Sequence, residues 1–185
     1  DWIVCQITPE GKRVRTYWYA VDAIDYYPYK FPKSRVEPQK LKDLLCKDEA
    51  CRKRLNGLYG KTLNEEMDKI TDELKKYRDA MAGRFAGWTV IQSGICMKHR
   101  FIEFRRAGSI KYNLFDGKLG TEKAVDVKLA TDMIILKDIY DTAIIVSGDQ
   151  DYVPSVQVAK DFGKHVVNVA FETENGELLP GGAWR

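Results

Sequence analysis

The stretch Ile144-Ile145-Val146-Ser147-Gly148-Asp149-Gln150-Asp151 joins a short apolar run to a turn that carries two carboxylates. A strand buried on both faces has this continuous apolar character, which is typical of a parallel sheet. Open α/β sheets place their functional sites just beyond the carboxyl ends of such strands. Two carboxylates at that position, with a glycine that lets the chain turn, indicate a site for a hard divalent cation such as Mg²⁺ or Mn²⁺.

The segments around this stretch predict alternating helices and strands. Residues 121–140 have an apolar face of helical period, with Thr121 as the expected cap. A short helix opened by Pro154 and closed by Gly163 follows the acidic turn, and residues 166–171 form the next expected strand. This order and these lengths predict right-handed crossovers and a parallel sheet covered on both faces. The predicted fold class is therefore α/β.

The first half of the chain predicts one strand followed by charged helices. Residues 12–21 are rich in β-branched and aromatic residues, which favour a strand. Residues 36–85 are highly charged and have a helical period, with a short helix near residues 41–45 and a longer one starting at a Thr62/Glu65 capping box. Apolar side chains then recur at steps of three and four, which predicts a core-facing stripe of Met67, Ile70, Leu74, Tyr77 and Met81. Residues 88–95 and 101–104 are predicted as strands.

Composition narrows the class of protein. The chain has 185 residues, enough for one domain with a sizeable core. Its net charge of +3 is mild, so nucleic-acid binding would need a local basic patch. No apolar run approaches the roughly 20 residues that span a bilayer, and the 4 cysteines do not resemble a secreted disulfide framework. We therefore expect a cytoplasmic protein with no membrane partner.

A third carboxylate is expected beside the acidic turn. A crossover helix runs antiparallel to its strands, so its first turn lies at the edge where the strands end, and this places Asp126 near Asp149 and Asp151. Crowded carboxylates repel one another unless a cation neutralises them or one takes up a proton. Such a site can bind one or two Mg²⁺ or Mn²⁺ ions, which activate a water and stabilise charge on a phosphodiester.

Two of these acidic positions have other interpretations. Asp132 lies about 9 Å further along the helix axis than Asp126, where a salt bridge or a supporting role is as well founded as direct metal ligation. Asp151 could instead be the N-cap of the helix that begins near Pro154.

Residues 98–112 interleave basic and aromatic side chains. Basic groups neutralise phosphates and aromatic faces stack on bases, so the segment is a candidate contact surface for a single strand. Its candidate substrate-binding residues are Arg100, Arg105, Arg106 and Lys111. Taken alone, the pattern fits an edge strand kept soluble by charge better.

Four other side chains have the chemistry of zinc ligands. Cys46, Cys51, Cys96 and His99 together could supply a tetrahedral set. The Cys96/His99 spacing is short for a zinc-finger pair, so we expect small buried residues or exposed thiols rather than a structural Zn²⁺.

The acidic residues, with the segments around them in the order in which they occur along the chain, resemble the NYN domain, a PIN-like nuclease fold of the LabA-like type. The resemblance covers roughly the last seventy residues, through TEKAVD at 121–126 followed by Asp132, IVSGDQDYVP at 145–154 and GKHV at 163–166. It implies a three-layer α/β/α sandwich around a mainly parallel, Rossmann-like sheet. Residues 12–21 fit the second strand of the family, and residues 36–85 would be a variable helical insertion in a single domain over residues 1–185.

The resemblance also implies an activity, that of a metal-dependent endoribonuclease that uses Mg²⁺ or Mn²⁺ and has RNA as its partner. Asp126, Asp149 and Asp151 match the acidic positions of the family. Ser147 matches its small polar residue before the turn, and Lys123 its basic residue beside the helix Asp. Gln150 and Tyr152 replace a small residue and a Phe, and neither change is expected to touch a ligand.

The resemblance leaves alternatives open. The family begins with a strand that ends in an Asp, followed by an Asn, and this chain starts after that point; we expect that both ends of a longer protein are missing. If that segment is absent from the protein, the acidic site is incomplete, which favours a non-catalytic LabA-like regulator or nucleic-acid-binding protein. If it was merely trimmed or disordered, the nuclease interpretation stands. A phosphatase or nucleotide-binding enzyme is a weaker alternative, because parallel sheets host many chemistries. A homodimer is left open.

Overall fold

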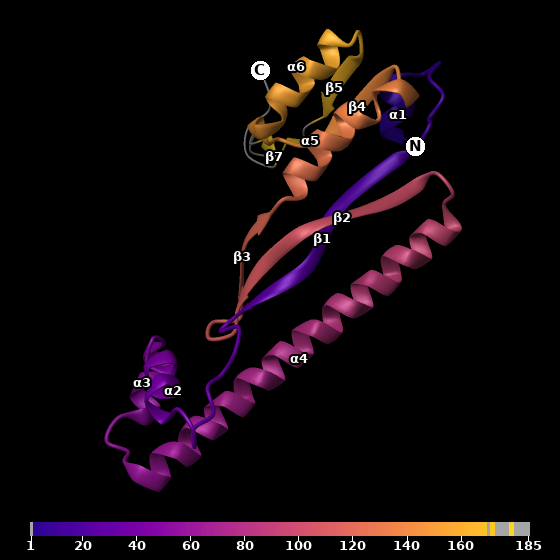
Figure 1. Cartoon of the computed structure of the whole chain (residues 1–185). Helices are drawn as coiled ribbons and strands as arrows, with labels where there is room; N and C mark the ends of the chain where they lie inside the picture. Colours follow the sequence, from indigo (N-terminus) through magenta and orange to yellow (C-terminus); the bar gives the residue numbers. More distant parts are fainter. Residues whose placement is uncertain (1, 170, 173–177, 180–185) are drawn as a thin grey trace. The chain divides into compact units, whose positions relative to one another are not determined.

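The computed structural model describes residues 2–169, 171–172 and 178–179. The chain, whose helices and strands are labelled in Figure 1, divides into two compact units, and the helical insertion predicted for residues 36–85 lies wholly in the second. The first unit contains residues 1–20, 96–107 and 123–185, and the second contains residues 21–95 and 108–122.

The first unit contains the parallel strand pair that the sequence predicted. β4 (Thr142–Val146) and β5 (His165–Val169) pair in parallel, with Ile145 opposite Asn168. A parallel pair needs a crossover connection, which η2 (Gln150–Tyr152) and α6 (Val153–Asp161) provide. α5 (Val125–Ile135) precedes β4, and the buried side chains of Met133, Ile145 and Ala159 join these elements in one core.

Short elements complete this unit. They are α1 (Trp2–Ile7), η1 (Lys137–Ile139) and the antiparallel pair of β6 (Phe171–Glu172) and β7 (Leu178–Leu179). The strand predicted for residues 166–171 therefore ends at Val169, and Phe171 begins another strand.

The two helices of the acidic region differ in how well their ends were predicted. α6 has Pro154 in its first turn and is followed by Gly163 at φ +76°, as the sequence indicated. The prediction for α5 was wrong at both ends. Thr121 lies in β3 (Lys118–Lys123), where the backbone pairs in a sheet, and the N-cap of α5 is Ala124 at φ 73°. The helix ends at Ile135, before the single turn of η1.

Ala124 and Gly163 form a matched pair for a stability test. Left-handed backbone costs an L-residue roughly 1–2 kcal/mol, and glycine avoids this at an entropic cost of about 0.5–1 kcal/mol. We expect Ala124→Gly to raise the free energy of unfolding by up to about 1 kcal/mol. Gly163→Ala should lower it, because Gly163 has a similar φ and no atom within 4 Å of an added Cβ. Urea unfolding measures both; a shift in the same direction for the two variants would be inconsistent with this backbone.

A three-stranded sheet has the order β1-β2-β3, with β1 at Thr16–Tyr27 and β2 at Ile102–Asn113. The Thr16 N–H donates to the Phe101 carbonyl at 2.7 Å, and the Leu114 N–H donates to the Tyr27 carbonyl at 2.7 Å. The start of β1 thus lies beside the start of β2, and the end of β1 beside the end of β2, so the two strands run parallel. The strands predicted at residues 12–21 and 101–104 are thus present, but β1 begins only at Thr16, and both strands end later than predicted.

The described residues form a mixed α/β fold with helices and parallel strand pairs, as expected for a PIN-like domain. β1-β2-β3 and β4-β5 are separate sheets among these residues. The three-layer sandwich around one sheet therefore remains a prediction. Within the same residues, every helix is too short or too polar to cross a membrane.

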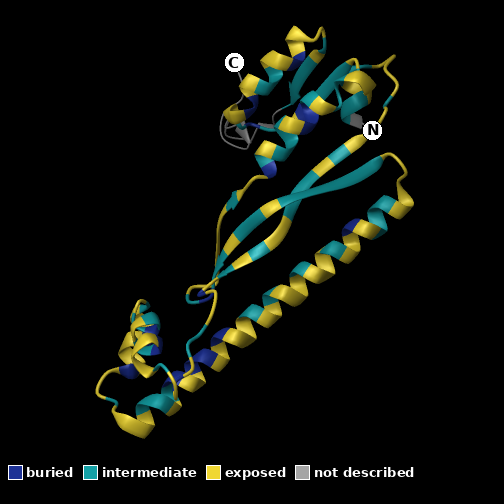
Figure 2. Ribbon diagram, in the orientation of Figure 1, coloured by how far each residue is buried: buried dark blue, intermediate teal, exposed yellow. Residues whose placement is uncertain are grey.

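The second unit is built around three helices, α2 (Pro38–Leu45), α3 (Glu49–Leu55) and α4 (Gly60–Lys98) up to Ile95. Its core contains Leu41, Leu45, Cys51, Leu55, Met67, Ile70, Leu74 and Leu114. Figure 2 shows that most buried positions of α4 lie in its first half, and Gln92 is buried nearer its other end. The predicted apolar stripe is confirmed for its first three members, whereas Tyr77 is exposed and Met81 is half-buried.

Two local predictions for α4 were wrong. Residues 88–95 are not a strand but continue α4, because adding a residue to an existing helix gains a hydrogen bond that outweighs strand propensity. Thr89 and Ser93 donate their hydroxyls to carbonyls one turn earlier, as polar residues in helices do. The capping box does not form, because α4 begins at Gly60 and the Thr62 hydroxyl donates to the Tyr59 carbonyl.

Candidate active site

The turn after β4 is held by its own side chains. The Asp149 N–H donates to the Ser147 hydroxyl oxygen at 3.1 Å, and the Asp151 N–H donates to Oδ1 of Asp149 at 2.9 Å. Asp149 therefore caps η2, and the alternative in which Asp151 caps the following helix is wrong. The Asp151 carboxylate takes no part in these turn contacts, and the residue is exposed.

Asp126 lies in the first turn of α5, and a tyrosine from η2 holds its carboxylate. The Tyr152 hydroxyl donates to Oδ1 of Asp126 at 2.9 Å. Tyr152 is only 4% exposed, so its ring is fixed by packing. The expectation that Tyr152 would leave the acidic residues untouched was wrong. The feature of the sequence that could have predicted this contact is the tyrosine hydroxyl, since a buried tyrosine hydroxyl usually finds a hydrogen-bond partner.

Asp126 and Asp151, two of the three acidic residues that the crossover argument expected to lie together, line one pocket. The pocket has a volume of about 370 Å³ and is lined by Asp126, Val127, Ala130, Thr131, Ile134, Ile135, Asp151 and Ser155. Its walls come from α5, η2 and the start of α6. Asp149 is not among these lining residues. The pocket therefore presents two carboxylates against an otherwise largely apolar surface.

The chemistry of these two donors fits a hard divalent cation. Mg²⁺ is commonly bound by one or two carboxylates, and waters and substrate phosphates complete its coordination. Asp126 and Asp151 supply the carboxylates for that arrangement, because both residues line one pocket. Among the described residues, however, no three His, Cys, Asp or Glu side chains are grouped so that they could hold a metal ion. The site with three carboxylate ligands thus stays a prediction.

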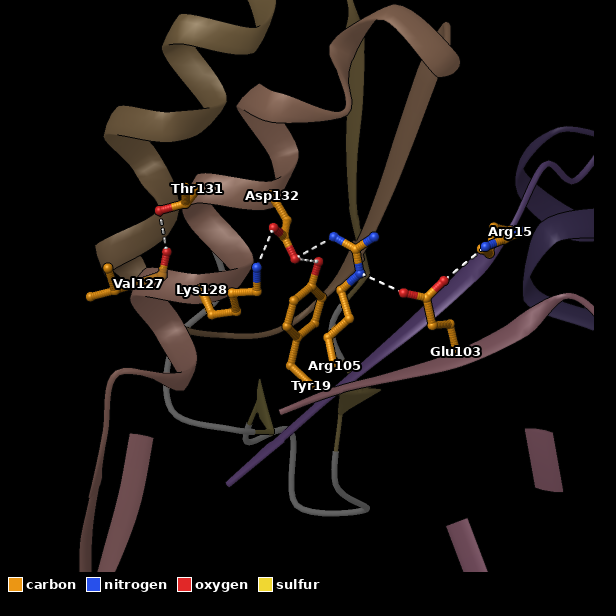
Figure 3. Close-up of polar contacts among 8 residues, drawn as sticks. All are labelled: Arg15, Tyr19, Glu103, Arg105, Val127, Lys128, Thr131 and Asp132. Carbon is orange, nitrogen blue, oxygen red and sulfur yellow. Dashed lines mark hydrogen bonds and ion pairs between the residues drawn. The ribbon is translucent and has the colours of Figure 1, made fainter. Parts of the chain in front are cut away.

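Asp132 is the centre of a separate polar network (Figure 3). It is 1% exposed and receives hydrogen bonds from Arg105 at 2.7 Å, Lys128 at 2.9 Å and the Tyr19 hydroxyl at 3.2 Å. Arg105 also pairs with Glu103 at 3.0 Å. These contacts connect α5 with β1 and β2. Of the two interpretations of Asp132, the salt bridge is the one observed.

The network sets the ionisation of its members. Burial alone would raise the pKa of Asp132, but the hydrogen bonds from Arg105 and Lys128 outweigh it and hold the pKa below its usual value. Burial and the neighbouring Asp132 carboxylate raise the pKa of Tyr19, so this hydroxyl stays a donor. Arg105 stacks over Tyr17 at 4.2 Å from the ring centroid. These contacts hold the Arg105 guanidinium in place, and its contact with substrate stays a prediction.

The other predicted substrate-binding residues are scattered. Ser147 supports the turn, and Lys123 is exposed at the end of β3. Arg100 is exposed and Arg106 is half-buried, both in the first unit, whereas Lys111 belongs to the second unit.

Sequence reasoning missed an aromatic pair on β1 and β2. Trp18 is 56% exposed and stacks on Phe104, with ring centroids 5.5 Å apart and an interplanar angle of 19°. Arg13 lies over the Phe101 ring, 5.3 Å from its centroid. Phe101 and Phe104 belong to the basic, aromatic segment that the sequence singled out, but their partners Trp18 and Arg13 lie about 85 residues earlier and carried no signal of the pairing.

The cysteines do not form a zinc site among the described residues. Cys51 lies in the core of the second unit, where burial and a hydrogen bond with Asp48 raise the pKa of its thiol to about 12. This matches the expected small buried residue. All 4 cysteines are free thiols.

The sequence model of the NYN domain matches residues 24–179 of the chain. The chain belongs to the NYN domain family. No curated protein and no solved structure matches it. NYN domains are PIN-like nuclease domains, so this chain is assigned a nuclease-like, RNA-related function at the level of the family.

The matched range covers the acidic turn and Asp126. It also covers residues 36–85, which the sequence suggested to be an insertion. Residues 12–21, which were expected to correspond to the second strand of the family, lie outside the match.

Proposed function

We propose that this NYN domain is a divalent-metal-dependent endoribonuclease. The observation that carries the proposal is the meeting of Asp126 and Asp151 at one pocket, beside the carboxyl end of β4. In open α/β sheets this is the edge at which ligands bind. Family membership supplies the nuclease class, and the two carboxylates supply the chemistry that a divalent metal needs.

Each acidic residue has a distinct role in the proposal. Asp126 and Asp151 would hold Mg²⁺ or Mn²⁺, and Asp149 would support them through the turn or add a third carboxylate. When bound, the metal activates a water and neutralises charge on the phosphodiester.

RNA would be held by groups outside the acidic pocket. The stacked Trp18 and Phe104 rings offer an aromatic surface of the kind on which unpaired bases stack. Phosphate contacts would come from Arg100, just before β2, and from Arg106 on β2. Lys123 and Ser147, close in sequence to the acidic residues, would add further phosphate contacts. We therefore propose single-stranded RNA as the substrate class. The 4 free thiols agree with a reducing compartment, and we propose the cytoplasm.

One observation favours the alternative of a non-catalytic RNA-binding regulator. In the described part of the chain, two carboxylates rather than three line the pocket, and no group of three metal ligands forms. An NYN domain with an incomplete acidic site would keep its fold and RNA contacts without turnover.

Cleavage of a labelled single-stranded RNA separates the two functions. The full chain is incubated with the RNA in Mn²⁺, in Mg²⁺ and in excess EDTA, and binding is measured in parallel by filter retention. The nuclease proposal expects internal cuts in either metal and none in EDTA. Binding without cleavage in both metals would reject the nuclease and support the regulator.

A further inference from the structure

We propose that Tyr152 is a positioning residue for metal binding: its hydroxyl holds Oδ1 of Asp126 and so leaves Oδ2 to a divalent cation. The inference rests on the proposed function, because it assigns Asp126 to a metal. It concerns a residue outside the set of carboxylates, at a position where the family resemblance led us to expect a Phe without a hydroxyl.

The geometry places Tyr152 between the two sources of carboxylates. It follows Asp151 directly in the chain and lies at the end of η2, whereas Asp126 lies on α5. The 2.9 Å hydrogen bond from the Tyr152 hydroxyl to Asp126 therefore ties the acidic turn to the helix. No other group among the described residues hydrogen-bonds the Asp126 carboxylate.

The chemistry of the contact explains how it could act on a metal. The terminal torsion of an aspartate is broad, so a carboxylate without a partner samples many orientations. A donor on one oxygen restricts this rotation, and a ligand fixed before binding loses less entropy when the metal arrives. Because Tyr152 is 4% exposed, the donor is itself held in place by packing. Hydrogen-bond partners that orient metal ligands in this way typically contribute 10–100-fold in metal affinity.

A purely structural role is the competing explanation, since a buried tyrosine hydroxyl needs a partner wherever it lies. Tyr140 provides the matched control. Its hydroxyl donates to the Met133 carbonyl at 2.7 Å in the same unit, and neither residue lines the acidic pocket. Tyr140→Phe and Tyr152→Phe each remove a hydroxyl and keep the ring, and of the two only Tyr152→Phe takes a donor from Asp126.

The test is a calorimetric Mn²⁺ titration of the full chain, in the absence of RNA, for the wild type and both variants. Tyr152→Phe should raise the Kd for Mn²⁺ by about 10-fold or more, whereas Tyr140→Phe should leave it unchanged. The thermal unfolding midpoints of the two metal-free variants should be similar. In an Asp126→Asn background, Tyr152→Phe should add no further loss of affinity.

Three outcomes would overturn the inference. If Tyr152→Phe binds Mn²⁺ as tightly as the wild type while the wild type still cleaves RNA, the hydroxyl does not position a ligand and the proposed function stands. If Tyr140→Phe weakens Mn²⁺ binding equally, the effect is a general loss of stability. If the wild type neither binds Mn²⁺ nor cleaves RNA, both the inference and the proposed function fail.

Discussion

Replacing Asp126 by Asn is expected to lower the rate of RNA cleavage by more than about 100-fold. Removing a residue that only hydrogen-bonds a metal ligand typically costs about 10–100-fold, and the loss of a ligand itself should exceed this. The change keeps the shape of the side chain and an oxygen that can accept from Tyr152, but it removes the negative charge that a divalent cation needs. The rate is measured under single-turnover conditions in saturating Mn²⁺, so that weaker RNA binding does not mask the effect.

Asp161→Asn is the control for that experiment. Asp161 is an exposed carboxylate at the end of α6 that accepts a hydrogen bond from Gln157 at 2.8 Å, and it does not line the acidic pocket. Asp161→Asn removes one negative charge from the same unit as Asp126→Asn does, so the cleavage rate of the Asp161→Asn variant should stay close to that of the wild type. Equal rates for Asp126→Asn and Asp161→Asn would remove Asp126 from the site.

The second large effect concerns stability. Asp132→Asn is expected to lower the free energy of unfolding by about 3 kcal/mol, because it leaves cations without their buried counter-charge. The side chain of Arg105 is 19% exposed and that of Lys128 is 38% exposed. The partly exposed Lys128 ammonium can be hydrated when Asp132 is neutral. The loss of unfolding free energy should therefore fall at the lower end of the range known for broken buried ion pairs. Urea unfolding at neutral pH measures it.

An exposed ion pair gives the comparison for Asp132. Asp138 pairs with Lys137 at 2.9 Å, and its side chain is 79% exposed. Exposed pairs contribute little, so Asp138→Asn should change stability hardly at all. A stability loss for Asp132→Asn as small as that for Asp138→Asn would show that the network in Figure 3 is not a stabilising feature.

The same network predicts a pH dependence. The pKa of Asp132 is lowered in the folded protein, against about 3.9 for an unfolded chain. Its contribution to stability is therefore fully present above the unfolded pKa and is lost as the pH falls through the folded pKa. Asp132→Asn lacks this contribution. The difference in unfolding free energy between wild type and variant should shrink as the pH falls below about 4, and a difference that grows would refute the assignment.

The sequence was most informative where short-range signals agreed. The apolar run before Ser147, the proline in the first turn of α6 and the left-handed Gly163 each act within a few residues, and together they predicted the β4-α6-β5 crossover. The antiparallel direction of the helix before β4 then predicted Asp126 near Asp151 without any contact information.

The predictions failed where distant or competing interactions decide the structure. Residues 88–95 have strand propensity, but the helix that enters them overrides it. The partners of Asp132 include Tyr19, 113 residues earlier, and no local pattern indicates that contact. Tyr152 was dismissed because its place in the sequence matched a Phe in the family, and only the folded structure shows its hydroxyl at Asp126.

The central claim is that this NYN domain cuts RNA internally by means of its acidic pocket. A circular single-stranded RNA tests it most directly, because a circle has no end from which an exonuclease could start. In Mn²⁺ the wild-type chain should convert the circle to linear RNA, and the Asp126→Asn variant should not. A circle that stays intact with the wild type, or one that the variant opens at the same rate, would contradict the claim.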